Sequence, residues 1–131
     1  MLEIIHENKD YIVVNKTAGR ISEHSSYEPI TTESLTLAHL LKSKSKPFIG
    51  VIHRLDRVTS GVIIFAKNKS NLVAFNRLFY NRKVQKTYLA IVKNKPPKNS
   101  GQLINYLKKN NLEKRAEIQL SQSNEAKESI L

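Results

Sequence analysis

The segment from His53 to Gly61, HRLDRVTSG, carries the side chains of this sequence that are best suited to chemistry. Asp56 stands between Arg54 and Arg57, and two hydroxyl residues and a glycine follow. A carboxylate can serve as a general acid, a general base or a nucleophile, and a neighbouring arginine favours its charged form. Apolar runs flank the segment on both sides, and a charge close to a buried core is costly unless it is paired or functional. This pattern favours Asp56 as a reactive group over a structural carboxylate.

Other chemistries fit the sequence less well. The four histidines are at least 14 residues apart and there are no cysteines, so the sequence predicts no metal site. Ser60, His53 and Asp56 have the residue types of a hydrolase triad, but the G-x-S-x-G elbow is missing. HRLD is only superficially similar to the H-R-D loop of protein kinases, because the Gly-rich loop and D-F-G are absent. The sequence therefore disfavours a hydrolase and a kinase.

Positive charge is concentrated in the middle of the chain. The 131 residues carry a net charge of +11, and the stretch from Lys67 to Arg115 holds 13 lysines or arginines against one acid, Glu113. Such a field attracts polyanions, most often nucleic acid, although a lysine-rich surface alone is the alternative. The sequence thus predicts RNA or DNA as a partner.

No apolar stretch approaches the roughly 18 residues of a membrane helix, and the first residues lack the pattern of a signal peptide. We therefore expect a soluble, cytoplasmic protein without a membrane partner. The oligomeric state stays open.

Apolar patterning and turn residues predict a mixture of strands and helices. Strands are expected on both sides of a turn at 8–10, and at 48–52, 62–66, 84–92, 102–107, 116–120 and from 125 onward. The runs at 48–52 and 62–66 are continuously apolar, which predicts strands covered on both faces. One helix should be capped by Thr32 or Ser34, reach about residue 43, and bury Leu37, Leu40 and Leu41. A second should be capped by Ser70 and bury Leu72, Phe75, Leu78 and Phe79. We expect an α+β fold with a mixed, mainly antiparallel sheet and flanking helices, in one domain over 1–131.

The stretch HRLDRVTSGVIIFAK resembles the signature of the RluA-type RNA pseudouridine synthases, H-R-L-D-x-x-T-S-G followed by apolar residues and A-K. DYIVVNKTAG is similar to their N-terminal N-K-P-A-G motif, with Thr17 in place of the proline. KTYLAIV resembles the strand that carries their active-site tyrosine. We expect no S4-type RNA-binding domain ahead of these motifs. The resemblance implies a pseudouridine-synthase fold and the isomerisation of uridine in ribosomal or transfer RNA, without cofactor or metal.

The same resemblance assigns roles to single residues. Asp56 matches the essential carboxylate, Arg54 the side chain that fills the space left by the flipped base, and Tyr88 the tyrosine that packs against it. His53 and Thr59 complete the expected substrate site. Phosphate contacts are expected from basic residues around the motif: Arg57, Lys67, Arg82, Lys83 and Lys86.

Members of that family carry a later motif of the form G-R-x-H-Q-I-R, whose arginine pairs with the catalytic aspartate. This sequence has no such stretch, and EAKESIL resembles the segment that precedes it. We therefore expect the C-terminal part of the catalytic fold to be missing and residues 1–131 alone not to catalyse. A fragment, a degenerate product and a site completed by another polypeptide stay open. A non-catalytic RNA-binding remnant is the competing function, and a partner-binding domain would require neither Asp56 nor Tyr88.

Overall fold

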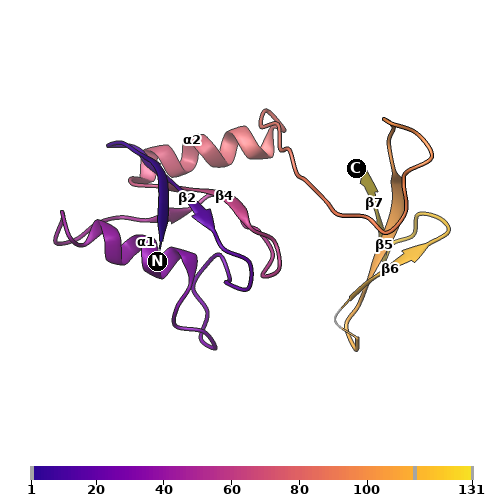
Figure 1. The fold of residues 1–131 in the computed structure, drawn as a ribbon, viewed down its shortest axis with the longest axis horizontal. Coiled ribbons are helices and arrows are strands. Elements are labelled where there is room, and N and C mark those ends of the chain that lie inside the picture. The colour runs from indigo at the N-terminus through magenta and orange to yellow at the C-terminus, as the bar shows by residue number, and fades with distance from the viewer. Residues whose placement is uncertain (1, 114, 131) are drawn as a thin grey trace. The chain divides into compact units, whose positions relative to one another are not determined.

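The computed structural model describes residues 2–113 and 115–130, which form two units along the chain. The first unit extends to Thr87 and the second begins at Tyr88 (Figure 1). Every strand pairing in both units is antiparallel, and two helices belong to the first unit. The α+β prediction is therefore confirmed, whereas a single domain over the whole length stays a prediction.

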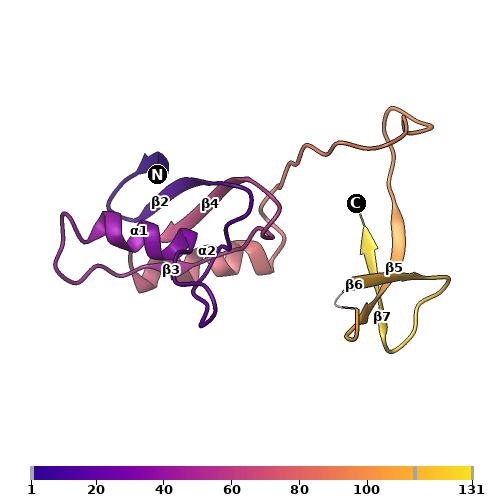
Figure 2. The same cartoon turned by 60° about the horizontal axis from the view of Figure 1, so that its bottom comes forward.

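Four strands form the sheet of the first unit in the order β1-β2-β4-β3. They are β1 (Glu3–Glu7), β2 (Tyr11–Lys16), β3 (Gly50–Val51) and β4 (Gly61–Ala66). The predicted turn at 8–10 is confirmed, because the side chain of Asn8 accepts hydrogen bonds from the N–H groups of Asp10 and Tyr11. β2 and β4 lie side by side (Figure 2), with Tyr11 opposite Ala66 and Lys16 opposite Gly61.

The observed caps of the two helices precede the predicted caps Thr32 and Ser70 by one and two residues. Thr31 caps α1 (Thr32–Leu40), and Ser34 completes a capping box with it. Asn68, rather than Ser70, caps α2 (Lys69–Tyr80), through a hydrogen bond to the N–H of Asn71. An N-cap side chain must accept from the backbone N–H two or three positions ahead, and Thr31 and Asn68 are the residues placed to do so.

The core of the first unit lies between α1 and one face of the sheet. It consists of Ile12, Val14, Leu40, Ile63 and Phe65. The buried face of α1 is Thr32, Thr36 and Leu40, at a spacing of four residues, so the prediction that Leu41 is buried is wrong. Leu41 falls off this stripe by one position and is 50% exposed.

The other face of the sheet is only partly covered. Phe75 of α2 packs edge-on against Tyr11, with ring centroids 5.6 Å apart. Val62 stays 53% exposed, and none of the residues of α2 is buried; Leu78 is exposed. The expectation that the strand at 62–66 is covered on both faces is therefore correct for one face and wrong for much of the other.

Two predicted strands are shorter than expected or absent. The run at 48–52 contributes only Gly50 and Val51 as β3, which pairs with β4 over two residues. Residues 84–92 form no strand, and Leu89 and Ile91 are fully exposed. A strand needs a neighbour to pair its backbone groups, and the described residues supply none for this segment.

The second unit holds a three-stranded sheet in the order β6-β5-β7. Its strands are β5 (Ile104–Asn110), β6 (Arg115–Gln119) and β7 (Ala126–Ile130). The strands predicted at 102–107, at 116–120 and after 125 are thus confirmed with small shifts. None of the helices in the described ranges is long and apolar enough to span a membrane.

Candidate active site

Asp56 lies on the loop of residues 52–60, which connects β3 to β4. Its side chain is exposed, and its carbonyl accepts a hydrogen bond of 3.1 Å from the N–H of Thr59, which closes a turn. Among residues 2–113 and 115–130, no hydrogen bond or ion pair occupies the carboxylate. The carboxylate is therefore open to a ligand.

The residues on either side of Asp56 are tied to the segment after β2. The hydroxyl of Ser22 donates to the carbonyl of Leu55 at 2.6 Å and accepts from its N–H at 3.0 Å. The N–H of Gly19 donates to the carbonyl of Arg57 at 2.7 Å. Ser22 is in turn fixed by α1, because its carbonyl accepts from the N–H of Glu33 at 3.0 Å. The backbone around Asp56 is thus held in place while its side chain stays accessible, as a preorganised catalytic group requires.

Lys16, the last residue of β2, donates hydrogen bonds to this loop and to the segment after β2. Its side chain is completely buried, and Nζ donates to the carbonyls of Arg20 at 2.6 Å, Arg57 at 3.2 Å and Thr17 at 3.3 Å. Burial lowers the pKa of Lys16, and the positive charge of Arg20 adds to this, whereas the charge of Asp56 acts in the opposite direction. Lys16 is therefore a buried cation whose field reaches the candidate carboxylate.

His53 anchors the start of the loop to β4 and α2. Its Nε2 accepts a hydrogen bond of 3.2 Å from the N–H of Ile64, so the neutral ring carries its proton on Nδ1. The ring stacks on Phe79, with centroids 5.1 Å apart and an interplanar angle of 15°. Burial lowers the pKa of His53, and the charge of Lys86 lowers it further. The acceptor role of Nε2 and the lowered pKa both favour the neutral imidazole.

Neither flanking arginine forms an ion pair with Asp56. Arg54 pairs with Glu23 at 2.5 Å, and Arg57 pairs with Glu28, so both guanidinium groups reach the loop of residues 20–30. The pKa of Arg54 is raised first by its hydrogen bond to Glu23, and the charge of Asp56 makes a smaller contribution. The arginines that flank Asp56 therefore pair with other acids, although Arg54 stays within the electrostatic range of Asp56.

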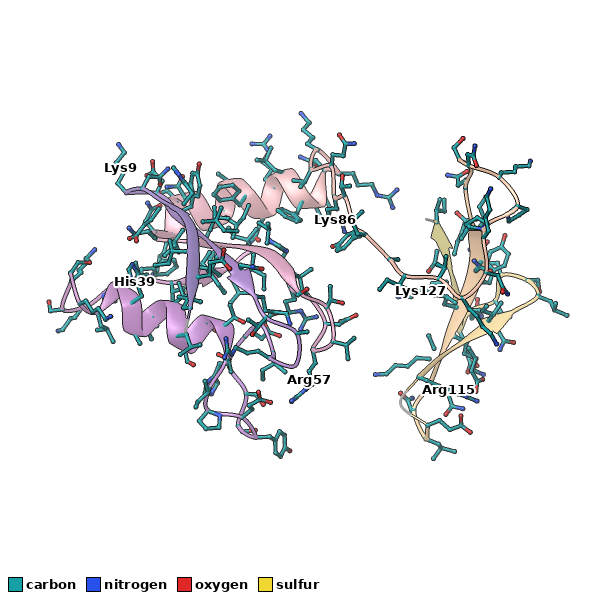
Figure 3. The ribbon with its side chains drawn as sticks, in the orientation of Figure 1. Lys9, His39, Arg57, Lys86, Arg115 and Lys127 are labelled. Atoms are coloured by element: carbon teal, nitrogen blue, oxygen red, sulfur yellow. The ribbon has the colours of Figure 1, made fainter. Side chains whose placement is uncertain are left out.

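The remaining predicted site residues are distributed over the chain. Thr59 is half-buried in the Asp56 loop, and Lys86 is exposed and close enough to His53 for its charge to act there. Figure 3 shows Arg57 and Lys86 with the side chains around them. Lys67 lies instead at the far end of β4, where it pairs with Glu7. Tyr88 belongs to the second unit and is 55% exposed, so its association with Asp56 stays a prediction.

Two residues that hold the Asp56 loop, Lys16 and Ser22, were not predicted from the sequence. A signal for Lys16 was present: Ile12, Val14 and Lys16 alternate along β2, and all three point into the core. Ser22 had no comparable signal, because its partner Leu55 is 33 residues away.

The arrangement can supply the positioned, exposed carboxylate of Asp56, with the cations Lys16 and Arg54 within its electrostatic range. A group of this kind can attack an electrophilic carbon or accept a proton. In the part of the chain that the structure describes, no group of three histidine, cysteine or acidic side chains could hold a metal ion.

Comparison with known proteins gives the family. The model of the RNA pseudouridylate synthase family matches residues 10–130. An uncharacterised RNA pseudouridine synthase of Haemophilus influenzae is 38% identical over 108 residues, which is 82% of this chain and 46% of that protein. The ribosomal large subunit pseudouridine synthase C of Rickettsia bellii is 34% identical over 85% of this chain and 34% of its own length. The chain thus spans half or less of each of these relatives.

Solved structures of two human proteins share the fold of this chain. Human RNA pseudouridylate synthase domain containing 1 superposes with a TM-score of 0.73 at 28% identity, covering 99% of this chain and 50% of the human chain. Human RNA pseudouridylate synthase domain containing 4 gives a TM-score of 0.76 at 24% identity, over 98% and 51% of the two chains, and supports the fold. The family model matches nearly the whole length, including the HRLD loop whose backbone hydrogen bonds hold Asp56 in position. This chain therefore belongs to the RNA pseudouridylate synthase family.

Proposed function

We propose that this chain carries the aspartate-bearing part of an enzyme that isomerises uridine to pseudouridine in ribosomal or transfer RNA in the cytoplasm. The observation that carries the proposal is the exposed Asp56 carboxylate on a loop that Ser22, Gly19 and Lys16 hold by its backbone. The chain's family membership supplies the reaction class, and relatives are named for ribosomal and for transfer RNA.

The reaction is an isomerisation and needs no oxidant or reductant. The N1–C1′ bond of the nucleotide breaks, the uracil turns, and C5 bonds to C1′; the proton of C5 is lost and N1 gains one. Asp56 is the catalytic residue, whether it attacks C1′, attacks the base or assists formation of a glycal. Each route requires a charged, positioned carboxylate.

The other site residues would receive the RNA. Arg54 would enter the space left by the flipped base, and its exposed pair with Glu23 is of the weak kind that such a movement can break. Tyr88 would pack against the uracil, and Arg57, Thr59 and Lys86 would contact the backbone. His53 would act as a positioning residue, because its acceptor atom is already used by Ile64.

The test is Asp56→Asn in the longest polypeptide that the gene encodes. Asparagine keeps the size of the side chain but removes its charge, so we expect pseudouridine formation to fall by about a thousandfold or more. Val58→Thr is the control in the same loop, because Val58 is 81% exposed and has no assigned role, and it should retain most of the activity. Pseudouridine is mapped chemically in the RNA, and unchanged turnover by the Asn variant would show that Asp56 is not the catalytic residue.

A non-catalytic RNA-binding role is the second candidate. The concentration of positive charge between Lys67 and Arg115 favours it, since binding to the RNA backbone does not require Asp56. Both candidates require RNA binding that weakens with salt, with a log–log slope of about −3 to −4 for roughly four to six contacted phosphates. The unsubstituted polypeptide separates the two: the enzyme forms pseudouridine and loses this activity with Asp56→Asn, whereas a protein that only binds RNA forms none with either residue.

A further inference from the structure

The end of the first sheet opposite Asp56 carries a second group of basic residues. β2 and β4 run antiparallel, so the Lys16–Gly61 end holds the Asp56 loop and the Tyr11–Ala66 end holds the turn at 8–10. Figure 3 shows Lys9 and Arg57 at these two ends. Six strand residues separate them, which corresponds to about 20 Å. The basic group is therefore not part of the candidate active site.

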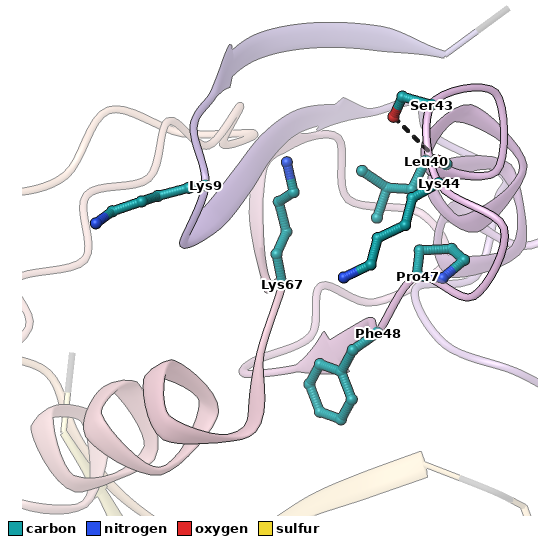
Figure 4. Close-up of a pocket in the computed structure, with 7 residues that line it drawn as sticks. All are labelled: Lys9, Leu40, Ser43, Lys44, Pro47, Phe48 and Lys67. Carbon is teal, nitrogen blue, oxygen red and sulfur yellow. Dashed lines mark hydrogen bonds between the residues drawn. The ribbon is translucent and has the colours of Figure 1, made fainter.

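A pocket of about 190 Å³ opens at this end (Figure 4). We call it the lysine pocket, and it is lined by Lys9, Leu40, Ser43, Lys44, Pro47, Phe48 and Lys67. Figure 4 shows the amino group of Lys44 pointing toward Lys67, whose own amino group reaches Glu7 and Asn8 at the turn, whereas the amino group of Lys9 points away. Ordinary ligand sites occupy about 300–1,000 Å³, so this pocket is too small to enclose a cofactor but large enough for a phosphate and part of a sugar or base.

The hydrogen-bonding capacity of the pocket suits an anion. Lys67 uses two of its three N–H donors, on Glu7 at 2.6 Å and on the carbonyl of Asn8 at 2.7 Å, which leaves one. Lys44 is exposed, and no partner holds its ammonium group within residues 2–113 and 115–130. Ser43 donates its hydroxyl proton to Leu40. The donors for an anion are therefore those of Lys44 and the third N–H of Lys67.

The net charge of the pocket is also positive. No carboxylate is among the described residues that line it, and the nearby Glu7 pairs with Lys67 and contacts His39 at 2.8 Å. Lys44 then contributes a positive charge to the pocket, whereas the amino group of Lys9 lies further from it. Pro47 and Phe48 are apolar residues of the same lining. Cations beside an aromatic side chain are the combination that proteins use to hold single-stranded nucleic acid.

We propose that the lysine pocket binds one nucleotide of the RNA, several positions along the strand from the target uridine, with its phosphate on Lys44 and Lys67 and its sugar or base against Phe48. The proposal rests on the proposed function in one respect, which is that RNA is the partner. A contact about 20 Å from Asp56 would fix the register of the strand without taking part in the chemistry.

The test compares Lys44→Glu with Lys46→Glu in the full chain. Both lysines are exposed on the segment after α1 and both variants change the charge equally, but only Lys44 lines the pocket. Binding of a fluorescent single-stranded RNA is measured by anisotropy over a range of salt concentrations. We expect Lys44→Glu to weaken binding about tenfold and to reduce the slope of log K against log salt by about 0.7, the value for one lost phosphate contact. Lys46→Glu should weaken it by less than about threefold, through the general field alone.

Phe48→Leu tests the aromatic side chain of the lining, because leucine keeps the packing but cannot stack; binding should weaken about fivefold. Equal losses in the two glutamate variants would overturn the proposal, since the field alone would then account for binding. Unchanged binding in both would overturn it as well and would leave the proposed function intact. A chain that binds no RNA at low salt would overturn both this proposal and RNA as the partner in the proposed function.

Discussion

Replacing Lys16 by methionine tests whether the loop under Asp56 is held by a buried charge. Methionine has a similar length and keeps the apolar packing, but it cannot donate to the three carbonyls that Nζ contacts. The carbonyl of Arg57 retains its 2.7 Å bond from Gly19, and Thr17 is exposed, so water can replace its long bond. The main loss is the 2.6 Å bond to the carbonyl of Arg20.

The magnitude follows from these contacts. A hydrogen bond from a charged donor contributes about 1.5–3 kcal/mol, and methionine also removes the unfavourable burial of an ammonium group. We therefore expect Lys16→Met to lower the free energy of unfolding by about 1–3 kcal/mol. Lys42→Met, at an exposed lysine of the first unit, should change it by less than about 0.5 kcal/mol.

The assay is urea unfolding followed by circular dichroism at the helix band, because both helices lie in the first unit. A pH series adds a second readout. The pKa of Lys16 is lowered in the folded state, so the unfolded state binds its proton more tightly. Stability of the unsubstituted chain should therefore gain a component as the pH rises toward the ordinary lysine value of 10.5, and the variant should lack it. An equally stable or more stable Lys16→Met chain would refute the reasoning.

Three further predictions concern the same loop and use the same urea titration. The lowered pKa of His53 means that the folded state binds this proton less tightly than the unfolded state does, so stability should fall as the pH drops below the ordinary value of 6.5. Glutamine keeps a hydrogen-bond acceptor but does not titrate, so His53→Gln should remove this pH-dependent part of the stability. An equal fall in both proteins would contradict it. Ser22→Ala leaves both backbone groups of Leu55 without their partner and should cost about 1–3 kcal/mol, whereas a neutral result would mean that water replaces the hydroxyl. Gly61 has φ +133°, where a side chain is strained, so Gly61→Ala should cost about 1–3 kcal/mol, and an unchanged unfolding midpoint would contradict this.

Local signals in the sequence were sufficient for much of the fold. The turn at 8–10 follows from an asparagine side chain that can accept from the next N–H groups, and β2 shows its inward face through strict alternation. The spacing of apolar residues by three or four positions predicted α1 and α2. The observed caps differ from the predicted Thr32 and Ser70 by one and two residues, because several neighbouring side chains could each have accepted the first N–H. The strand expected at 84–92 was wrong, since β propensity indicates only that a segment fits a sheet and supplies no neighbour to pair with.

By itself the sequence determined the family and predicted Asp56 as the reactive group, because the HRLD loop, its flanking apolar runs and Gly61 are contiguous along the chain. Tertiary structure alone decided how that loop is held and what its cations contact. Ser22 reaches Leu55 over 33 residues and Lys16 reaches Arg57 over 41, and the arginines beside Asp56 pair with acids about 30 residues away. A hydrogen bond or an ion pair depends on the position of both partners in space, and the identity of one residue carries no information about which distant group the fold will bring within reach.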